Sequence, residues 1–197
     1  MRERPPLPAP VLRRRAGSRW PPRARRVHHP DFGRARRSAG TNIPGVSLPS
    51  DMRAFNRSVI ENFRAGDGRI TREGMLKGSD LVLLTTVGRR SGRQHIVPLG
   101  YLTDGDDRTV LWASDMAAAE HPQWYRNLVA EPQVIIERPT PAGIDLFTGT
   151  AHTAAGPERE RLFAILEERF PHMAAHQQQT EREIPLVVVE RVSGLAD

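Results

Sequence analysis

The sequence predicts an α+β fold: a small closed or split β-barrel of about six mostly antiparallel strands, with helices packed on it. Three observations support this prediction. The chain has 197 residues, a length that suits one domain with a tail better than two domains. Apolar runs of strand length outnumber the segments with helical spacing. The first strands are separated by turns too short for a helical crossover, which favours antiparallel hairpins over a parallel α/β sheet.

The amino-terminal 50 residues differ from the rest in charge and composition. Residues 1–50 hold 12 Arg against Glu3 and Asp31, a net +10, so the total of +6 leaves −4 for residues 51–197. The segment is proline-rich and shows no apolar period, so burial could not offset the entropy of ordering it. We predict a disordered Arg/Pro-rich extension over 1–50 and one folded domain over 51–197. Two alternatives are an arm that binds nucleic acid or anionic lipid, and a stretch translated upstream of a natural start at Met52.

Composition narrows the function classes. The chain has no cysteine, which excludes disulfides, thiolate metal sites and thiol nucleophiles. No apolar run approaches the roughly 18 residues of a membrane-spanning helix. We therefore expect a cytoplasmic protein without a membrane span, with peripheral contact at the inner membrane face as an alternative. The folded part is acidic and lacks a basic stripe with interleaved aromatic residues, so nucleic acid is expected to bind only through the basic tail.

Generic catalytic and metal motifs are absent. The chain has no G-x-S-x-G, P-loop, H-E-x-x-H or dinucleotide glycine pattern, which favours a borrowed cofactor. His172 and His176 are four residues apart, as two metal ligands on one helix face would be, but no carboxylate pattern accompanies them. We interpret them as surface histidines and predict no metal site.

The first half of the domain predicts one helix and three strands. The helix begins near residue 52 with Ser50 or Asp51 as its cap and ends at the glycines near residue 66. Its apolar residues recur at helical spacing: Met52, Phe55, Val59, Ile60 and Phe63. Strands are predicted over 81–87, 94–102 and 109–113, with turns at 88–92 and 104–107.

The second half predicts two helices and three strands. A short helix over 122–130 has Pro122 in its first turn. Strands over 134–136 and 144–150 surround a turn at 139–143, and a helix over 157–170 follows them. The last strand is predicted over 184–189, where Pro185 near its beginning is tolerated.

The turn between the first two strands is a candidate anion site. Gly88 and Gly92 bound it, and Arg89, Arg90 and Arg93 supply three guanidinium groups. Such a turn exposes backbone N–H groups, and guanidinium forks match phosphate or carboxylate. A solvated basic hairpin explains the same residues equally well.

Several motifs in this order resemble the deazaflavin-dependent nitroreductase family, also described as deazaflavin-dependent quinone reductases. The turn at 88–92 matches G-R-[RK]-[ST]-G, and residues 122–128 match P-x-W-Y-x-N-L. Pro98-Leu99, Tyr101-Leu102, Ala113-Ser114 and Ile184-Pro185 complete the pattern over roughly residues 52–191. The resemblance implies a split β-barrel of the FMN-binding type, the coenzyme F(420) as cofactor, and a homodimer.

The resemblance also implies where the coenzyme binds and what it does. The anionic tail of the coenzyme would lie on the turn, and its ring in the groove beyond. A hydride would then pass from the reduced ring to a small acceptor such as a quinone or a nitroaromatic, with no catalytic side chain assigned. The implied tail contacts are Arg89, Arg90, Ser91 and Gly92, with Arg93, His95 and Asp115 along the path of the anionic tail. The implied ring contacts are Pro98, Ala113, Ser114, Trp124 and Asn127.

Departures from the family pattern leave alternatives open. His95 stands where the family usually has arginine, and Asp115 where lysine is common. Both changes remove positive charge from the anion path, so an FMN-dependent oxidoreductase is the second hypothesis. A barrel that carries a cofactor or lipid without turnover is the third. Phe170, His176 and Gln179 occupy the stretch where studied members carry tyrosines, so the resemblance does not imply the acceptor.

Overall fold

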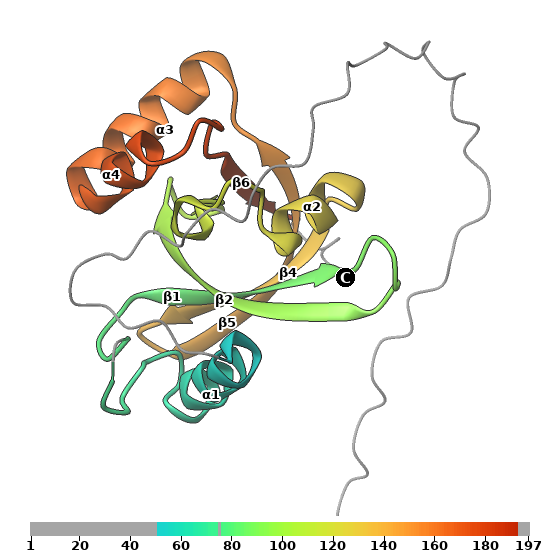
Figure 1. Ribbon diagram of the computed structural model, residues 1–197. Helices are drawn as coiled ribbons and strands as arrows, with labels where there is room; N and C mark the ends of the chain where they lie inside the picture. Colours follow the sequence, from blue (N-terminus) through green and yellow to red (C-terminus); the bar gives the residue numbers. More distant parts are fainter. Residues whose placement is uncertain (1–50, 75, 193–197) are drawn as a thin grey trace, which may run out of the picture. The chain divides into compact units, whose positions relative to one another are not determined.

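Six antiparallel strands close into a barrel in the computed structural model, which describes residues 51–74 and 76–192 (Figure 1). Their order is β1-β2-β3-β6-β5-β4, and β4 pairs back onto β1. The predicted α+β barrel is therefore confirmed, whereas the extension predicted over 1–50 lies outside the described residues. The strands are β1 (Leu81–Val87), β2 (Gln94–Thr103), β3 (Arg108–Trp112), β4 (Gln133–Thr140), β5 (Gly143–Thr153) and β6 (Leu186–Arg191).

The first four residues of β1 are apolar because both faces of the strand are buried there. Val82 and Leu84 belong to the cluster inside the barrel. Leu81 and Leu83 point the other way and pack with α1 (Met52–Ala65). Because successive side chains of a strand alternate between two faces and both faces are buried here, Leu81–Leu84 are all apolar.

The helix α1 begins where its cap predicts. The Asp51 carboxylate accepts hydrogen bonds from the N–H groups of Arg53 and Ala54, each at 2.9 Å. A side-chain oxygen at this position satisfies N–H groups that have no partner inside the helix. Of the two predicted caps, Asp51 is therefore the one used, and Val59 and Phe63 form the buried face.

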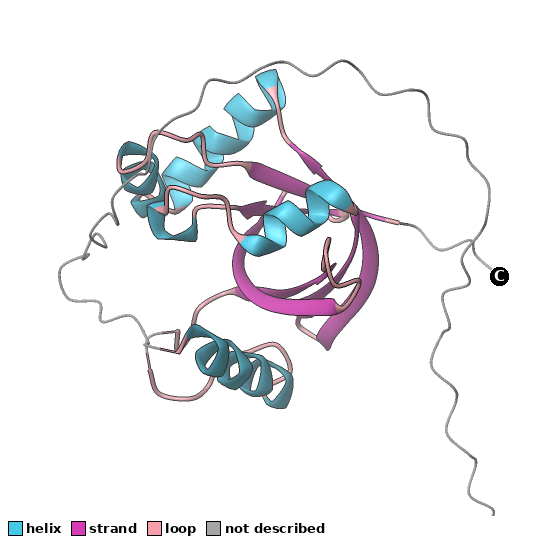
Figure 2. Ribbon diagram, turned by 45° about the vertical axis from the view of Figure 1, so that its right-hand side comes forward, coloured by secondary structure: helices cyan, strands magenta, loops and turns pink. Residues whose placement is uncertain are grey.

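The other helices cover different parts of the barrel (Figure 2). Trp124 and Leu128 on α2 (Gln123–Ala130) belong to the interior cluster. Leu162 and Leu166 on α3 (Gly156–Arg169) pack with the outer residues of β3 and β6. The short α4 (His172–Gln178) follows α3. Among the described helices, none has the length and apolar character needed to cross a membrane.

The structure corrects the prediction in two places. Strand β4 continues through Thr140 and β5 begins at Gly143, so the predicted turn at 139–143 shrinks to residues 141–142. Pro139 is tolerated in the longer strand because β1 pairs with β4 only at residues 135–137 and leaves that edge free. The short α4 and the 3-10 turn η1 (Asp115–Ala117) were not predicted, because neither offers enough residues to show a helical period.

One strand edge of the barrel is only partly paired, and it positions the site described below. Strand β2 pairs with β1 over Gln94–Gly100, but with β3 only over Tyr101–Thr103. The first part of β2 therefore has a ladder on one side only. Pro98 lies in this part, where its missing N–H costs no ladder bond.

Candidate functional site

The basic turn between β1 and β2 is closed by its own backbone. The Gly88 N–H donates to the Arg93 carbonyl, and the Gly92 N–H donates to the Gly88 carbonyl, both at 2.7 Å. Gly92 has a φ of 65°, in the left-handed region that glycine adopts at little cost. The Ser91 hydroxyl accepts from the Arg93 N–H at 3.3 Å. The backbone conformation at position 92 therefore explains why a glycine stands there.

The arginines of this turn have no acidic partners among the described residues. Arg89, Arg90 and Arg93 are exposed, and no ion pair within residues 51–74 and 76–192 includes any of them. The backbone N–H groups of Arg90 and Ser91 also donate to no acceptor in this part of the chain. Three unpaired guanidinium groups beside free N–H groups make a suitable surface for an anion.

Asn127 ties the turn to α2. Its side chain is fully buried. Its Oδ1 accepts from the Arg89 N–H and from Gln123 Nε2, and its Nδ2 donates to Thr86 Oγ1, each at 3.2 Å. Because these bonds occupy the buried amide, we infer that Asn127 acts on the site by positioning the turn. Its predicted direct contact with the ring stays a prediction.

His95 lies against the turn from β2. A Cβ added at Gly88 would lie 2.7 Å from His95 Nε2 and 2.5 Å from Ser91 Oγ, so only glycine admits both side chains. The Ser91 hydroxyl and His95 Nε2 are 3.4 Å apart. Two predicted tail contacts, Ser91 and His95, are thus brought together, on the same surface as the three arginines.

The loop after β3 has an unusual backbone. Ala113 and Ser114 are buried at its start. Asp115, Met116 and Ala117 then have φ values of 47°, 51° and 62°. Left-handed backbone costs an L-residue about 1–2 kcal/mol, so three consecutive non-glycine residues in this region require support from outside the loop.

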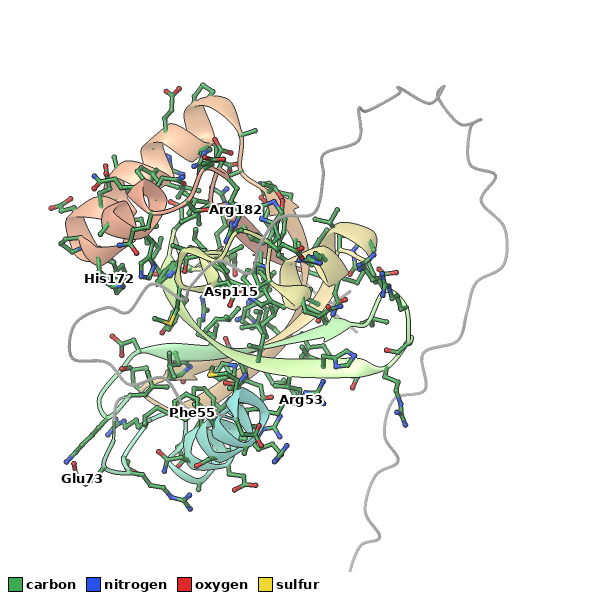
Figure 3. The ribbon with its side chains drawn as sticks, viewed as in Figure 1. Arg53, Phe55, Glu73, Asp115, His172 and Arg182 are labelled. Atoms are coloured by element: carbon green, nitrogen blue, oxygen red, sulfur yellow. The ribbon has the colours of Figure 1, made fainter. Side chains whose placement is uncertain are left out.

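Arg182 supplies that support from the segment before β6. Its guanidinium group donates to the carbonyls of Ala113 at 3.0 Å, Ser114 at 2.6 Å and Ala118 at 2.8 Å. Figure 3 shows Arg182 and Asp115 on neighbouring segments. Burial lowers the pKa of Arg182 below its usual value, and the Asp115 charge opposes this shift. The sequence did not single out Arg182, because no local motif distinguishes it from the other arginines.

The same guanidinium group reaches His121. Arg182 Nη1 lies 3.2 Å from His121 Nδ1. Burial, and then the charges of Arg182 and Arg126, lower the pKa of His121 below its usual value. The imidazole is therefore neutral at pH 7, and Nδ1 can accept the hydrogen bond with the proton on Nε2.

The aromatic residues lie on two sides of the barrel wall. Trp112 packs on the outer side, where its ring covers Gly100 so closely that a Cβ there would be 2.8 Å from Cζ2. Its ring centroid is 5.0 Å from that of Phe170. Trp124, by contrast, is 8% exposed and belongs to the interior cluster with Ala113. Its predicted contact with the ring remains untested.

A large cavity lies elsewhere among the described residues. It has a volume of about 720 Å³ and is lined by Asp80, Tyr101 and Pro139, near the start of β1. The basic turn follows the other end of that seven-residue strand, about 20 Å away at roughly 3.3 Å per residue. None of the predicted site residues lines this cavity, so its volume does not make it the candidate site. In the described ranges no group of three His, Cys, Asp or Glu is arranged to hold a metal ion.

Comparison with known proteins identifies relatives of the chain. Residues 55–191 match the family model described as F420H(2)-dependent quinone reductase. The chain is 34% identical over 116 residues to the protein Rv3178 of Mycobacterium tuberculosis. The aligned residues make up 59% of this chain and 93% of that protein. It is 33% identical over 113 residues to the F420H(2)-dependent quinone reductase Rv1261c of the same organism, which covers 56% and 72%.

Two solved structures are also similar to the chain. One described as the structure of an F420-H2 dependent reductase (FDR-A) is 33% identical with a TM-score of 0.51, covering 56% of this chain and 94% of that one. A second, described as a domain-swapped dimer, is 29% identical with a TM-score of 0.52, covering 70% and 97%. The residues matched by the family model, 55–191, include the basic turn, the loop after β3 and α2.

Proposed function

The chain belongs to the F420H(2)-dependent quinone reductase family, and from that premise we propose that it transfers a hydride from reduced coenzyme F(420) to a small organic acceptor such as a quinone or a nitroaromatic. The observation that carries the proposal is the basic turn, where Arg89, Arg90 and Arg93 have no acidic partner among the described residues. The coenzyme tail bears phosphate and carboxylate groups, which are the anions that such a turn binds.

The residues present fit this coenzyme at its anionic end. Gly92 faces open space, since a Cβ there would meet no atom within 4 Å. The N–H groups of Arg90 and Ser91 have no acceptor within the described residues. An anion seated there would receive backbone hydrogen bonds and guanidinium forks together. In this proposal the tail binds Arg89, Arg90, Ser91, Gly92, Arg93 and His95.

The ring site is proposed along the partly paired edge of β2. Pro98 lies on this edge, and the buried loop start at Ala113 and Ser114 follows β3. When bound, the coenzyme supplies the hydride, so the chain needs no nucleophile of its own. The work of the chain's residues is to orient the ring and the acceptor and to hold charge at the tail.

The second candidate is an FMN-dependent oxidoreductase on the same fold. It is favoured by His95 and Asp115, because a histidine and an exposed aspartate stand where the family pattern has two cationic side chains. FMN carries a single phosphate and therefore needs fewer cations than the longer anionic tail. A barrel that only carries its ligand is the third candidate, and a homodimer stays a prediction.

A fluorescence titration separates these candidates. The purified chain is titrated with coenzyme F(420) and, in parallel, with FMN, while the tryptophan emission is recorded. We expect saturable quenching by F(420) alone. Quenching by FMN alone would replace the cofactor in the proposal, and quenching by neither would overturn it.

A turnover assay then tests the acceptor class. Reduced F(420) is mixed with the chain and a soluble quinone, and the absorbance of the oxidised coenzyme is followed. Two electrons and two protons pass from the reduced coenzyme to the quinone, giving a quinol. We expect oxidation that depends on both the chain and the quinone. Tight binding without oxidation of the coenzyme by any quinone or nitroaromatic would indicate a carrier instead.

A further inference from the structure

The loop after β3 is held by a residue that no motif assigns to the site. We propose that Arg182 is a positioning residue of the coenzyme site, which holds the loop at 113–118 in its bound geometry and connects it to α4. Only the expected effect of Arg182 on coenzyme binding rests on the proposed function. The effect on the loop itself can be measured without any ligand.

The contacts of Arg182 span the whole loop. It donates to the carbonyl of Ala113 before the turn η1, to that of Ser114 at its start, and to that of Ala118 after it. The fourth contact, to His121 Nδ1, reaches toward α2. A planar guanidinium group can serve these four acceptors at once, because its five N–H groups diverge in one fixed fork. An ammonium group cannot.

The loop depends on these contacts. Only two backbone bonds within it are present, from the Ala117 N–H to the Ser114 carbonyl and from the Ala118 N–H to the Asp115 carbonyl, both at 3.0 Å. The left-handed backbone of Asp115–Ala117 works against the turn. Because Ala113 and Ser114 are the proposed ring contacts, a loop that relaxes would displace them from the ring.

Gln177 of α4 fixes the backbone on which Arg182 stands. Its Nε2 donates to the Arg182 carbonyl at 2.9 Å, and its Oε1 accepts from the Ile184 N–H at 2.8 Å. One side chain thus holds the backbone that directly follows the arginine side chain, at the Arg182 carbonyl and the Ile184 N–H. A continuous set of hydrogen bonds therefore runs from α4 through Gln177 and Arg182 to the loop, and both residues should act on the same loop equilibrium.

The test compares substitutions at two half-buried arginines. Arg182→Met removes all four contacts and Arg182→Lys keeps the charge. The matched control is Arg191→Met, since Arg191 on β6 covers the Phe147 ring at 3.8 Å and pairs with Asp145. The dissociation constant for F(420), the values of kcat and KM with a quinone, and the unfolding temperature are measured for each.

We expect Arg182→Met to raise the dissociation constant for F(420) at least tenfold and to lower kcat, with Arg182→Lys recovering only part of the loss. Millimolar guanidinium ion should partly restore binding to Arg182→Met and not alter the control. Arg191→Met should lower the unfolding temperature and leave the dissociation constant within twofold. Equal losses of affinity in the two methionine variants would overturn the proposal.

Two further measurements keep the inference testable. In the ligand-free protein, the amides of Ala117 and Ala118 should exchange hydrogen at least tenfold faster in Arg182→Met than in Arg191→Met. Unchanged exchange would overturn the inference even if F(420) proves not to be the cofactor. If Arg182→Met does not fold, Gln177→Ala replaces it, and Gln177→Ala together with Arg182→Lys should lose less affinity than the sum of the two single losses.

Discussion

The two turns that bound β2 differ in how nearby arginines are paired. The turn before β2 carries three arginines of its own, whereas the turn after β2, at residues 104–107, is acidic and is contacted by arginines of β3 and α3. Before β2, Arg89, Arg90 and Arg93 are exposed and have no acidic partner among the described residues. After β2, the hairpin carboxylate of Asp104 receives one bond from Arg108 at 2.6 Å and two from Arg161 at 2.8 Å.

The turn at residues 104–107, the paired turn, belongs to a network that fastens α3 to the barrel, whereas the basic turn at 88–93 is the unpaired turn. Arg108 also pairs with Glu158 on α3, and His152 Nε2 lies 3.1 Å from the second oxygen of that carboxylate. The comparison teaches that residue type does not decide the role of an arginine in this chain. The paired turn should contribute to stability and the unpaired turn to binding, and the predictions below test that division.

The largest effect is expected where the unpaired turn meets the core. Asn127→Ala should lower the free energy of unfolding by about 3 kcal/mol, because it leaves the Arg89 N–H and the Thr86 hydroxyl without a partner in a buried place. Denaturant titration measures the loss. Gln123→Ala removes only the third bond of Asn127 and serves as the control. A loss below about 1 kcal/mol for Asn127→Ala would show that the turn is held by its own backbone.

The next effect concerns binding alone. Arg90→Ala should raise the dissociation constant for F(420) about 10- to 100-fold, the equivalent of one lost hydrogen bond to a charged group. Its unfolding temperature should not change, because the side chain is exposed. Arg64→Ala is the matched control, since Arg64 is also exposed but pairs with Glu137 at 2.5 Å. Unchanged affinity in Arg90→Ala would remove the anionic tail from this turn.

The paired turn should show the reverse behaviour. Arg108→Met should lower the free energy of unfolding by about 1–2 kcal/mol, since Asp104 and Glu158 each lose a partner that is 27% exposed. Coenzyme affinity should stay unchanged. Thermal unfolding and the fluorescence titration, run on the same preparation, check both statements. A weakened affinity would mean that the two turns are not independent.

The smallest effect is the acid sensitivity of the paired turn. The hydrogen bond from Arg161 lowers the pKa of Asp104, and the one from His152 lowers the pKa of Glu158. A carboxyl group with a folded-state pKa below its unfolded value of 3.8 or 4.5 stabilises the fold above that value. The contribution is lost as the pH falls through the folded-state pKa. The loss therefore lies below about pH 4.5, and both groups are partly exposed, so it should be small.

Unfolding free energies between pH 7 and pH 3 measure this effect. Asp104→Asn should flatten the acid limb of the curve relative to the unsubstituted chain. Asp106→Asn changes an exposed carboxyl group of the same hairpin and should leave the limb unaltered. An identical slope for all three proteins would show that solvent screens the network completely.

The helices and strands could be predicted from the sequence because the patterns that indicate them involve neighbouring residues. The spacing of Val59 and Phe63, the Asp51 cap and the glycines of the basic turn all act within a few residues. The same glycines, with the arginines between them, also located the basic turn as a candidate anion site. Sequence reasoning missed Arg182 and Gln177, because their partners lie in other segments and neither residue stands in a motif.

By itself, the sequence determined the order of helices and strands, the boundaries of the basic turn and the family. These depend on backbone preferences and on apolar periods, which are properties of neighbouring residues. Only the tertiary structure decided which arginines are paired and which polar groups hold the site. Asn127 bonds to Thr86 across 41 residues, and Arg182 bonds to Ala113 across 69. Such contacts join residues that are far apart in the sequence. They form only when closure of the barrel brings those segments close together in space.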